Sequence, residues 1–223
     1  MTVKDEIKES FDSIVNDYDS YMENTNHTNS QRKIIELLKD EIKGEIIDIG
    51  TGTGFIAISI AKIVKRSKIS GIDISENMIE KAKKNAQMAG VDINFFVGDV
   101  EKSGLPDNKF DIVICCLGML WFVDKEASLK EMIRICKNNG KIILIEEEGE
   151  TTRLKKPEKI ENRDNIFNER LLSFFSKIEK LETPISTEDI EKKMDTLGYR
   201  MDKKVKEKID ENHGFVGMVF ASK

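Results

Sequence analysis

Apolar residues recur at helical spacing over the first forty residues. Phe11 and Tyr18 belong to one such series and Ile34 and Leu38 to another, and the residues between the two series, 23–31, are polar. Positions three or four apart lie on one face of a helix, so each series predicts an amphipathic helix. We therefore expect two N-terminal helices joined by a polar loop.

Short apolar runs then alternate with helical patterns through the middle of the chain. Strands are predicted at 45–50, 68–74, 93–97, 110–116 and 141–145, and helices at 55–64, 75–90 and 124–137. Strands and helices that alternate in this way form a parallel sheet with right-handed crossovers and with helices on both faces. The central fold is therefore expected to be α/β.

The alternation breaks after the fifth predicted strand. Residues 150–182 begin as a charged stretch and continue as a helix, and the apolar side of this helix carries Phe167, Leu171, Phe174, Phe175 and Ile178. No strand is an obvious partner for this side, so we interpret the helix as a lid over an acceptor site or as a dimer face. A helix that begins at Ser186 and ends at Gly198, followed by a hairpin of strands at 199–209 and 215–221, completes the fold.

These patterns divide the chain into four parts. We expect an N-terminal helical cap (1–40), a ligand-binding α/β core (41–149), a helical insertion (150–183), and a C-terminal helix and β-hairpin that complete the core (184–223). A length of 223 residues fits one α/β domain with an attachment.

Composition and charge narrow the classes of function. With 39% hydrophobic and 35% charged residues, the chain can form a core and does not resemble a disordered protein. The net charge of −5 makes nucleic acid an unlikely partner. The longest apolar run, 112–123, is too short to span a bilayer, and the first residues lack the apolar core of a secretory signal. We therefore expect no membrane span and a cytoplasmic protein.

Three cysteines are the obvious metal-binding candidates. Cys115 and Cys116 are adjacent, and Cys136 falls on the apolar face of the helix predicted over 124–137. These positions lack the ligand spacings of a metal site. We expect buried, reduced thiols and no bound metal.

A glycine-rich turn follows the first predicted strand. Gly50, Gly52 and Gly54 stand between this strand and the next helix, where exposed N–H groups can approach a ligand. Position 55 is Phe55, whereas a dinucleotide fingerprint would have its third glycine there. Asp48 precedes the turn, and a carboxylate there suits a ligand with a cationic amine or sulfonium better than a pyrophosphate.

Two further carboxylates follow the next two predicted strands. Asp73 is placed to accept hydrogen bonds from both hydroxyls of an unphosphorylated ribose, and Asp99 to accept one from the exocyclic amine of adenine. Because the ends of parallel strands meet at one edge of a sheet, the three carboxylates are expected to share a crevice. The sequence therefore predicts a nucleoside ligand with a cationic part.

These motifs resemble those of the class I S-adenosylmethionine (SAM)-dependent methyltransferases. The resemblance is carried by Ile46-Ile47-Asp48-Ile49-Gly50-Thr51-Gly52-Thr53-Gly54, Gly71-Ile72-Asp73-Ile74-Ser75 and Gly98-Asp99-Val100. Segments 105–113, 131–134 and 139–141 are similar to the small-molecule branch that includes ubiquinone and menaquinone methyltransferases, although Asn139 replaces a glycine usual there. The resemblance implies a Rossmann-like, doubly wound, seven-stranded sheet whose last strand, 215–221, lies antiparallel beside the fifth.

The resemblance also implies a set of cofactor-binding residues. Gly50 and Gly52 would pass under the methionine part of SAM, Asp73 would hold the ribose, and Asp99 would address the adenine. Tyr18 either closes over the methionine end or only packs within its helix. The full expected set is Tyr18, Asp48, Gly50, Thr51, Gly52, Asp73, Ile74, Met78, Asp99, Val100, Cys116 and Leu117.

The implied reaction is an in-line transfer of the sulfonium methyl group to a small molecule, with S-adenosylhomocysteine as product. His213 and His27 are the candidate bases, but the sequence shows no charge partner for either, which favours exposed loop positions. The run Glu146 to Glu148 is expected to be solvated or near the cofactor. Residues 119–121, Met-Leu-Trp, form either the apolar floor of an acceptor pocket or part of the core.

Several alternatives stay open at this point. The chain lacks the Asn or Asp followed by prolines that methyltransferases of adenine or glutamine amines carry after the fourth strand, and the proline that accompanies a thiolate nucleophile beside Cys116. A non-catalytic SAM-binding regulatory or partner subunit, or a nicotinamide-dependent oxidoreductase, would share much of the pattern. The identity of the acceptor is open, and the chain could be a monomer or a homodimer.

Overall fold

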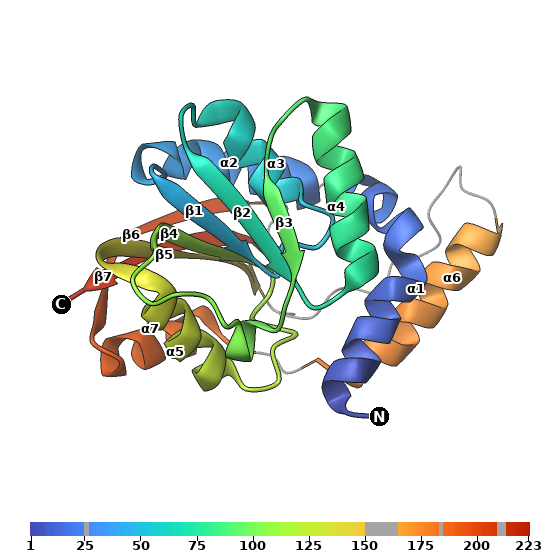
Figure 1. The fold of residues 1–223 in the computed structure, drawn as a ribbon. Coiled ribbons are helices and arrows are strands. Elements are labelled where there is room, and N and C mark those ends of the chain that lie inside the picture. The colour runs from blue at the N-terminus through green and yellow to red at the C-terminus, as the bar shows by residue number, and fades with distance from the viewer. Residues whose placement is uncertain (25–26, 150–164, 183–184, 209–212) are drawn as a thin grey trace.

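The computed structural model describes residues 1–24, 27–149, 165–182, 185–208 and 213–223 (Figure 1). A seven-stranded sheet in the order β3-β2-β1-β4-β5-β7-β6 forms its centre. The strands are β1 (Glu45–Ile49), β2 (Lys68–Asp73), β3 (Asn94–Val97), β4 (Phe110–Cys116), β5 (Cys136–Gly149), β6 (Tyr199–Lys208) and β7 (His213–Ser222). The first five strands are parallel, and β7 pairs antiparallel with both β5 and β6. The predicted doubly wound sheet with an antiparallel C-terminal strand is confirmed.

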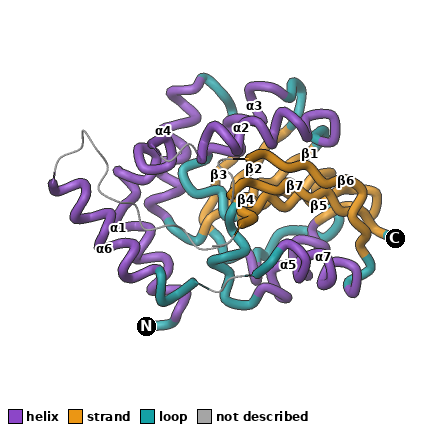
Figure 2. Tube along the Cα trace, turned by 180° about the vertical axis from the view of Figure 1, so that it is seen from behind, coloured by secondary structure: helices purple, strands orange, loops and turns teal. Residues whose placement is uncertain are grey.

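Helices cover both faces of the sheet. The α-helices are α1 (Val3–Asn24), α2 (His27–Leu38), α3 (Phe55–Ile63), α4 (Glu76–Ala89), α5 (Lys125–Ile135), α6 (Asn165–Ile178) and α7 (Thr187–Thr196), and short 3₁₀ helices are η1 (Lys39–Glu41) and η2 (Val100–Lys102). Helices α2, α3 and α4 lie on one face, and α5 and α7 on the other (Figures 1 and 2). Two buried clusters fill the layers between helices and sheet.

The alternation of side chains along the strands explains these two clusters. In β5, Ile143 and Ile145 belong to the cluster under α2 and α3, whereas Ile142 and Leu144 belong to the cluster under α5 and α7. Successive residues of a strand point to opposite faces, so a continuous apolar run supplies both layers.

Local capping signals set several helix boundaries where the sequence predicts them. The side chain of Ser75 accepts a hydrogen bond from the Met78 N–H, and Ser186 accepts one from the Asp189 N–H. Gly90 ends α4 in the left-handed conformation, with φ of 67°. These are the N-cap and C-cap arrangements that satisfy the free backbone groups of helix ends.

Two boundary predictions are wrong. Helix α2 begins at His27, so most of the predicted polar loop at 23–31 is helical, and its polar residues Thr28 and Gln31 are buried. Cys136 does not lie on a helix face but begins β5, which runs well beyond the predicted 141–145. In both cases partners that are distant in the sequence decide the structure. A hydrogen bond joins His27 of α2 to Glu147, and β7 pairs with the charged end of β5.

Helices α1 and α6 lie side by side, away from the two sheet-covering layers (Figures 1 and 2). Leu171, Phe174, Phe175 and Ile178 of α6 are at most 2% exposed because they pack against Ile14, Tyr21 and Met22 of α1 in a third apolar cluster. The apolar side of α6 is therefore buried within the chain, and it is not the exposed dimer face that the sequence left open. The side chain of Phe167 and residues 150–164 lie outside the described part.

Over the described residues, no helix combines the length and apolar character needed to cross a membrane.

Candidate active site

The glycine turn between β1 and α3 has the backbone conformation that its sequence predicts. Gly50, Gly52 and Gly54 have φ of 65°, 52° and 84°. A Cβ at Gly52 would meet no atom within 4 Å, so the positive φ alone favours glycine there, whereas a Cβ at Gly54 would lie 2.9 Å from the Phe95 ring. The turn is therefore open toward a ligand at Gly52 and closely packed against the core at Gly54.

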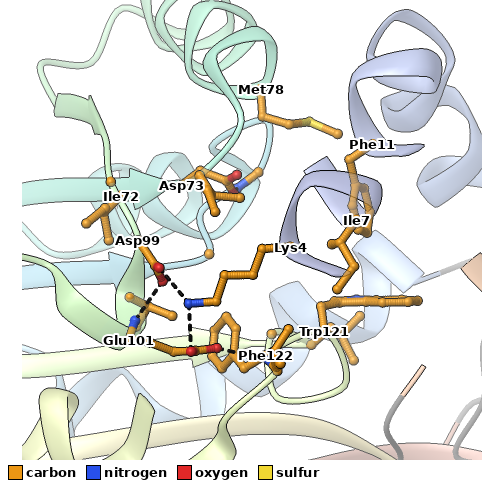
Figure 3. Close-up of a pocket in the computed structure, with 18 of the residues that line it drawn as sticks. Lys4, Ile7, Phe11, Ile72, Asp73, Met78, Asp99, Glu101, Trp121 and Phe122 are labelled. Carbon is orange, nitrogen blue, oxygen red and sulfur yellow. Dashed lines mark hydrogen bonds and ion pairs between the residues drawn. The ribbon is translucent and has the colours of Figure 1, made fainter. Parts of the chain in front are cut away.

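Asp73 ties this turn to the end of β2. One of its carboxylate oxygens accepts a hydrogen bond from the Gly52 N–H at 2.9 Å, and the other accepts one from the Ser75 N–H at 2.9 Å. Burial raises the pKa of Asp73, and the backbone N–H donors oppose that shift. The carboxylate is thus fixed at the edge of a cleft by two backbone groups (Figure 3).

Asp48 lies behind the turn. It is 1% exposed and accepts a 2.7 Å hydrogen bond from the Thr51 hydroxyl. Burial raises its pKa to about 7, although the hydrogen bond from Thr51 acts in the opposite direction. Asp48 and Thr51 line another cavity, to which Gly50 and Gly52 also belong, and the contact between Asp48 and Thr51 stabilises the turn.

Asp99 has a partner that the sequence did not indicate. Its carboxylate lies 2.6 Å from the Nζ of Lys4 in α1, and the same Nζ lies 2.6 Å from a carboxylate oxygen of Glu101. The second oxygen of Asp99 accepts a hydrogen bond from the Glu101 N–H and so caps η2. Figure 3 shows Lys4 reaching over the cleft toward both carboxylates. The first residues of α1 are therefore attached to the ends of the strands.

We call the space between α1 and the ends of β1, β2 and β3 the strand-end cleft. It encloses about 840 Å³ including its open mouth. Ten of the expected cofactor residues line it, namely Tyr18, Gly50, Gly52, Asp73, Ile74, Met78, Asp99, Val100, Cys116 and Leu117. The expectation that three strand ends share one crevice is confirmed for Asp73 and Asp99, whereas Asp48 lies behind it.

Sequence reasoning missed the residues that close the cleft from above. These are Lys4, Ile7 and Phe11 of α1 and Phe122 of the segment after β4, and they line the cleft beside Trp121, which the sequence had already offered as a pocket residue (Figure 3). The helical spacing that includes Phe11 indicates a buried face but not its partner. Lys4 carries no sequence signal, because its carboxylate partners lie far away in the chain.

A second cavity, of about 580 Å³ including its open mouth, adjoins the cleft, and we call it the acidic pocket. The residues that line it are Tyr18, Tyr21, Met22, Leu117, Leu120, Trp121, Glu146, Glu147, Phe174 and Ile185. Tyr18, Leu117 and Trp121 line both cavities, which places them at the junction. Leu120 and Trp121 therefore contribute to a pocket, as one interpretation of their sequence expects, whereas Met119 is fully buried in the core.

The prediction of an exposed loop position for His27 is wrong, and one of the two interpretations of the glutamate run, a solvated position, is excluded for Glu146 and Glu147. His27 does not lie in an exposed loop: it is 8% exposed, and its Nε2 lies 2.7 Å from Oε1 of Glu147. Glu146 and Glu147 are 7% and 8% exposed, so neither is solvated. Burial raises the pKa of Glu146 to about 8, the neighbouring Glu147 adds to the rise, and the Met119 N–H that donates to Glu146 opposes it. The reason is the length of β5, which extends beyond its predicted end at residue 145 and pairs with β7 through Glu146 and Glu147.

The remaining candidates take different places. The backbone of His213 pairs with Gly149 at the start of β7, and its side chain lies outside the described part. Cys115 and Cys136 are buried and Cys116 is half-buried, and none of the three forms a disulfide. Burial raises the pKa of the Cys116 thiol, which favours the neutral form and argues against a thiolate nucleophile.

Comparisons with known proteins agree with this geometry. The family model described as "Methyltransferase domain" matches residues 40–197. A demethylmenaquinone methyltransferase of Bacteroides fragilis is 30% identical over 151 residues, which make up 64% of this chain and 60% of that protein. The chain thus spans less than two thirds of the length of this curated relative.

Two solved structures share the fold over nearly the whole chain. A SAM-dependent methyltransferase of Thermotoga maritima, described as a possible histamine N-methyltransferase, has a TM-score of 0.68 at 22% identity and covers 97% of this chain and all of its own. Magnesium protoporphyrin IX methyltransferase of Synechocystis PCC 6803 with bound SAM has a TM-score of 0.68 at 16% identity and covers 98% and 97% of the two chains. The family match over residues 40–197 shows that the chain belongs to the methyltransferase domain family, and its fold is the one that these SAM-dependent methyltransferases share.

Proposed function

We propose that this protein is a SAM-dependent methyltransferase that methylates a small-molecule acceptor, with S-adenosylhomocysteine as product. The observation that carries the proposal is the pair of adjoining cavities: the strand-end cleft for the cofactor and the acidic pocket for the acceptor. Tyr18, Leu117 and Trp121 at their junction would surround the point at which the methyl group is transferred.

The residues of the strand-end cleft suit SAM. Gly52 presents backbone to open space, as a ligand approaching closely requires. Asp73 is fixed by two backbone N–H groups with its remaining lone pairs available to ribose hydroxyls. Met78, Ile74 and Val100 supply an apolar surface for the adenine. We assign the cofactor-binding role to the ten residues that line the cleft, and a supporting role to Asp48 and Thr51 behind the glycine turn.

Bound SAM would supply an electrophilic methyl group on a sulfonium. The chain's own contribution is to orient the acceptor against that methyl group and to exclude water, and orientation of this kind supplies on the order of 7 to 11 kcal/mol. Helix α1 contributes residues to both cavities and α6 contributes Phe174 to the acidic pocket, so we infer that these two helices form the roof of the acceptor site and exclude water. Glu147, which lines the acidic pocket, can accept a proton from the acceptor, and His27 holds it in place.

The wider setting of the protein follows from the same features. The net charge of −5 argues against a polyanionic acceptor such as nucleic acid. Three cysteines that form no disulfide fit a reducing compartment, so we propose a cytoplasmic location. A monomer already contains all residues that line both cavities, although a homodimer would be compatible with them.

Calorimetry and product analysis test the proposal. SAM should release or take up heat on binding, NAD should not, and Asp73→Ala should abolish the SAM signal. The protein should then produce S-adenosylhomocysteine from SAM in a metabolite extract, with a product heavier by one CH₂ group in the mass spectrum. Absence of SAM binding would refute the proposal, and SAM binding without turnover in any extract would favour a non-catalytic SAM-binding subunit.

A further inference from the structure

The acidic pocket combines two kinds of side chain. Tyr18, Tyr21, Trp121 and Phe174 present aromatic rings, and two carboxylic acids complete the lining. Glu146 and Glu147 are neighbours in β5, so they reach the pocket from opposite faces of the strand. Glu146 shares its face with the cluster under α5, and Glu147 shares its face with the cluster under α2 and contacts His27.

The electrostatics of this pocket favour a cation. Among the described residues that line it, none is a lysine or arginine. The positive charge of Lys125, which is not part of the lining, lowers the pKa of Glu146. Burial and the nearby Glu147 outweigh this effect and raise that pKa. A bound cation would offset both effects. Aromatic faces attract the same kind of ligand through their quadrupoles.

We propose that the acidic pocket binds the acceptor as a small protonated aliphatic amine with an apolar or aromatic body, and that the carboxylate of Glu147 removes the proton before methyl transfer. This inference rests on the proposed methyltransferase function, since it names the acceptor class for that site. The aromatic rings that line the pocket limit the acceptor to a small molecule.

The chemical step balances with these groups alone. An ammonium R–NH₃⁺ gives one proton to Glu147, and the lone pair of the resulting R–NH₂ attacks the methyl carbon of SAM. The new N–CH₃ bond forms as the C–S bond breaks, and its electron pair leaves on sulfur. The products are R–NH₂⁺–CH₃ and neutral S-adenosylhomocysteine, and Glu147 holds the proton until it exchanges with solvent.

The absent Asn-Pro or Asp-Pro motif after β4 agrees with this acceptor class. The segment there reads Cys115-Cys116-Leu117-Gly118. Exocyclic amines of adenine and amide nitrogens have delocalised lone pairs that need carbonyl groups to align them. An aliphatic amine is a strong nucleophile once it is deprotonated, so a carboxylate base is sufficient.

Trp121 provides a direct readout, because it is the only tryptophan of the chain and lines both cavities. With S-adenosylhomocysteine bound, the protein is titrated with 2-phenylethylamine and with the neutral isostere 2-phenylethanol while Trp121 fluorescence is followed. We expect the amine to bind at least about tenfold more tightly, since a charge-assisted hydrogen bond replaces a neutral one. Equal affinities, or tighter binding of the alcohol, would overturn the proposal.

Matched variants assign the preference to the pocket. Glu147→Gln should bring the two affinities to within about twofold, because the carboxamide keeps the shape of the side chain but carries no charge. Glu148→Gln is the control: Glu148 is next in β5 but pairs with Lys206 and does not line the pocket. If both variants keep the amine preference, or both lose it, the assignment to this pocket is wrong. Circular dichroism confirms that each variant is folded.

A fractionated extract separates failure of this inference from failure of the proposed function. A metabolite extract is passed over a cation exchanger, and each fraction is assayed with SAM for S-adenosylhomocysteine. Turnover confined to the retained, cationic fraction supports the inference. Turnover confined to the flow-through, which holds phenols, quinols and acids, overturns the inference and leaves the methyltransferase function intact. If neither fraction is active while SAM binds, the acceptor inference is wrong. If SAM does not bind either, the proposed function itself fails.

Discussion

The floor and the roof of the candidate site are built in different ways. The floor consists of the glycine turn and the ends of β1 to β3. Its contacts join residues that are relatively close in the sequence: the Gly52 N–H donates to Asp73, which lies 21 positions further along the chain. The roof consists of α1, α6 and the segment after β4, and its contacts join distant residues. Lys4 lies 95 positions from Asp99, and Arg170 lies 153 positions from Asp17.

This difference explains which parts of the site have a sequence signature. A floor made of backbone conformation needs glycine and capping residues at fixed spacings, and these can be recognised in a single sequence. A roof made of packed side chains needs only apolar residues at helical spacing, which many partners satisfy. The floor therefore identifies the family, whereas the roof is where the choice of acceptor is expected to reside.

The largest effect should follow from removing an aromatic ring of the roof. Phe174→Ala deletes a side chain that is 1% exposed between α6 and α1 and in contact with the Phe11 ring, and such truncations cost about 3 to 5 kcal/mol. Hydrogen–deuterium exchange should speed up across α1 and α6 with little change in β1 and β4. Phe95→Ala, the matched floor variant, should loosen the strands around the glycine turn. A uniform loss of protection in both variants would show that floor and roof unfold as one unit.

The second effect concerns the floor. Asp73→Ala removes the proposed acceptor of the ribose hydroxyls and leaves the Gly52 and Ser75 N–H groups without their carboxylate, so SAM affinity should fall by about 100-fold or more. Calorimetry measures the change. Asp73→Asn keeps one oxygen acceptor and should lose less SAM affinity. Asp92→Ala, at an exposed position before β3, should bind SAM as tightly as the native protein. Unchanged affinity in Asp73→Ala would remove this residue from the cofactor site.

How much the sequence predicts follows the same division. Periodicity and local capping predicted the alternating strands and helices and the glycine turn, whereas the antiparallel β7 beside β5 was implied only by the family resemblance. The start of α2 and the length of β5 were not predicted, because burial against distant partners overrides local polarity there. His27 shows the limit: its sequence neighbours are polar, and only the fold brings it within 2.7 Å of Glu147. The acidic pocket could not be inferred from a Glu run that is also typical of an exposed strand end.

The third prediction tests whether the carboxylic acid under the roof costs stability. The folded-state pKa of Glu146, about 8, lies above the ordinary 4.5, so the folded protein keeps a proton that the unfolded chain loses. The stability that protonated Glu146 contributes to the fold is therefore fully present below pH 4.5 and is lost as the pH rises toward 8. Glu146→Gln cannot ionise and keeps an oxygen that can accept from Met119. The stability of the variant relative to the native protein should thus increase with pH, reaching on the order of 4 kcal/mol at pH 8.

Urea unfolding at several pH values measures this difference, and Glu148→Gln is the control. Burial opposes ionisation of Glu148, but Lys206 and Thr187 outweigh it and lower its pKa. The stability contribution of Glu148 is therefore present above its unfolded pKa and is lost as the pH falls, the opposite sign to that of Glu146. If the free energy of unfolding of Glu146→Gln does not rise with pH relative to the native protein, the burial of this acid under the roof does not oppose folding.

The smallest effect concerns the ion-pair cluster through which Lys4 joins the roof to the floor. The Nζ of Lys4 lies 2.6 Å from carboxylates of Asp99 and Glu101, and both pairs are partly exposed, so the contact is worth at most about 1 kcal/mol. Lys4→Met keeps the apolar stem but releases the start of α1. Since the same opening admits and releases SAM, both rate constants should rise by up to about fivefold while the Kd changes less than twofold. Stopped-flow fluorescence of Trp121 measures both rates.

Lys8→Met is the matched control, because Lys8 pairs with Asp12 of its own helix at 2.9 Å and does not join α1 to the strands. Equal rates in the two variants would mean that the aromatic contacts of α1, and not its charge, hold the roof on the floor.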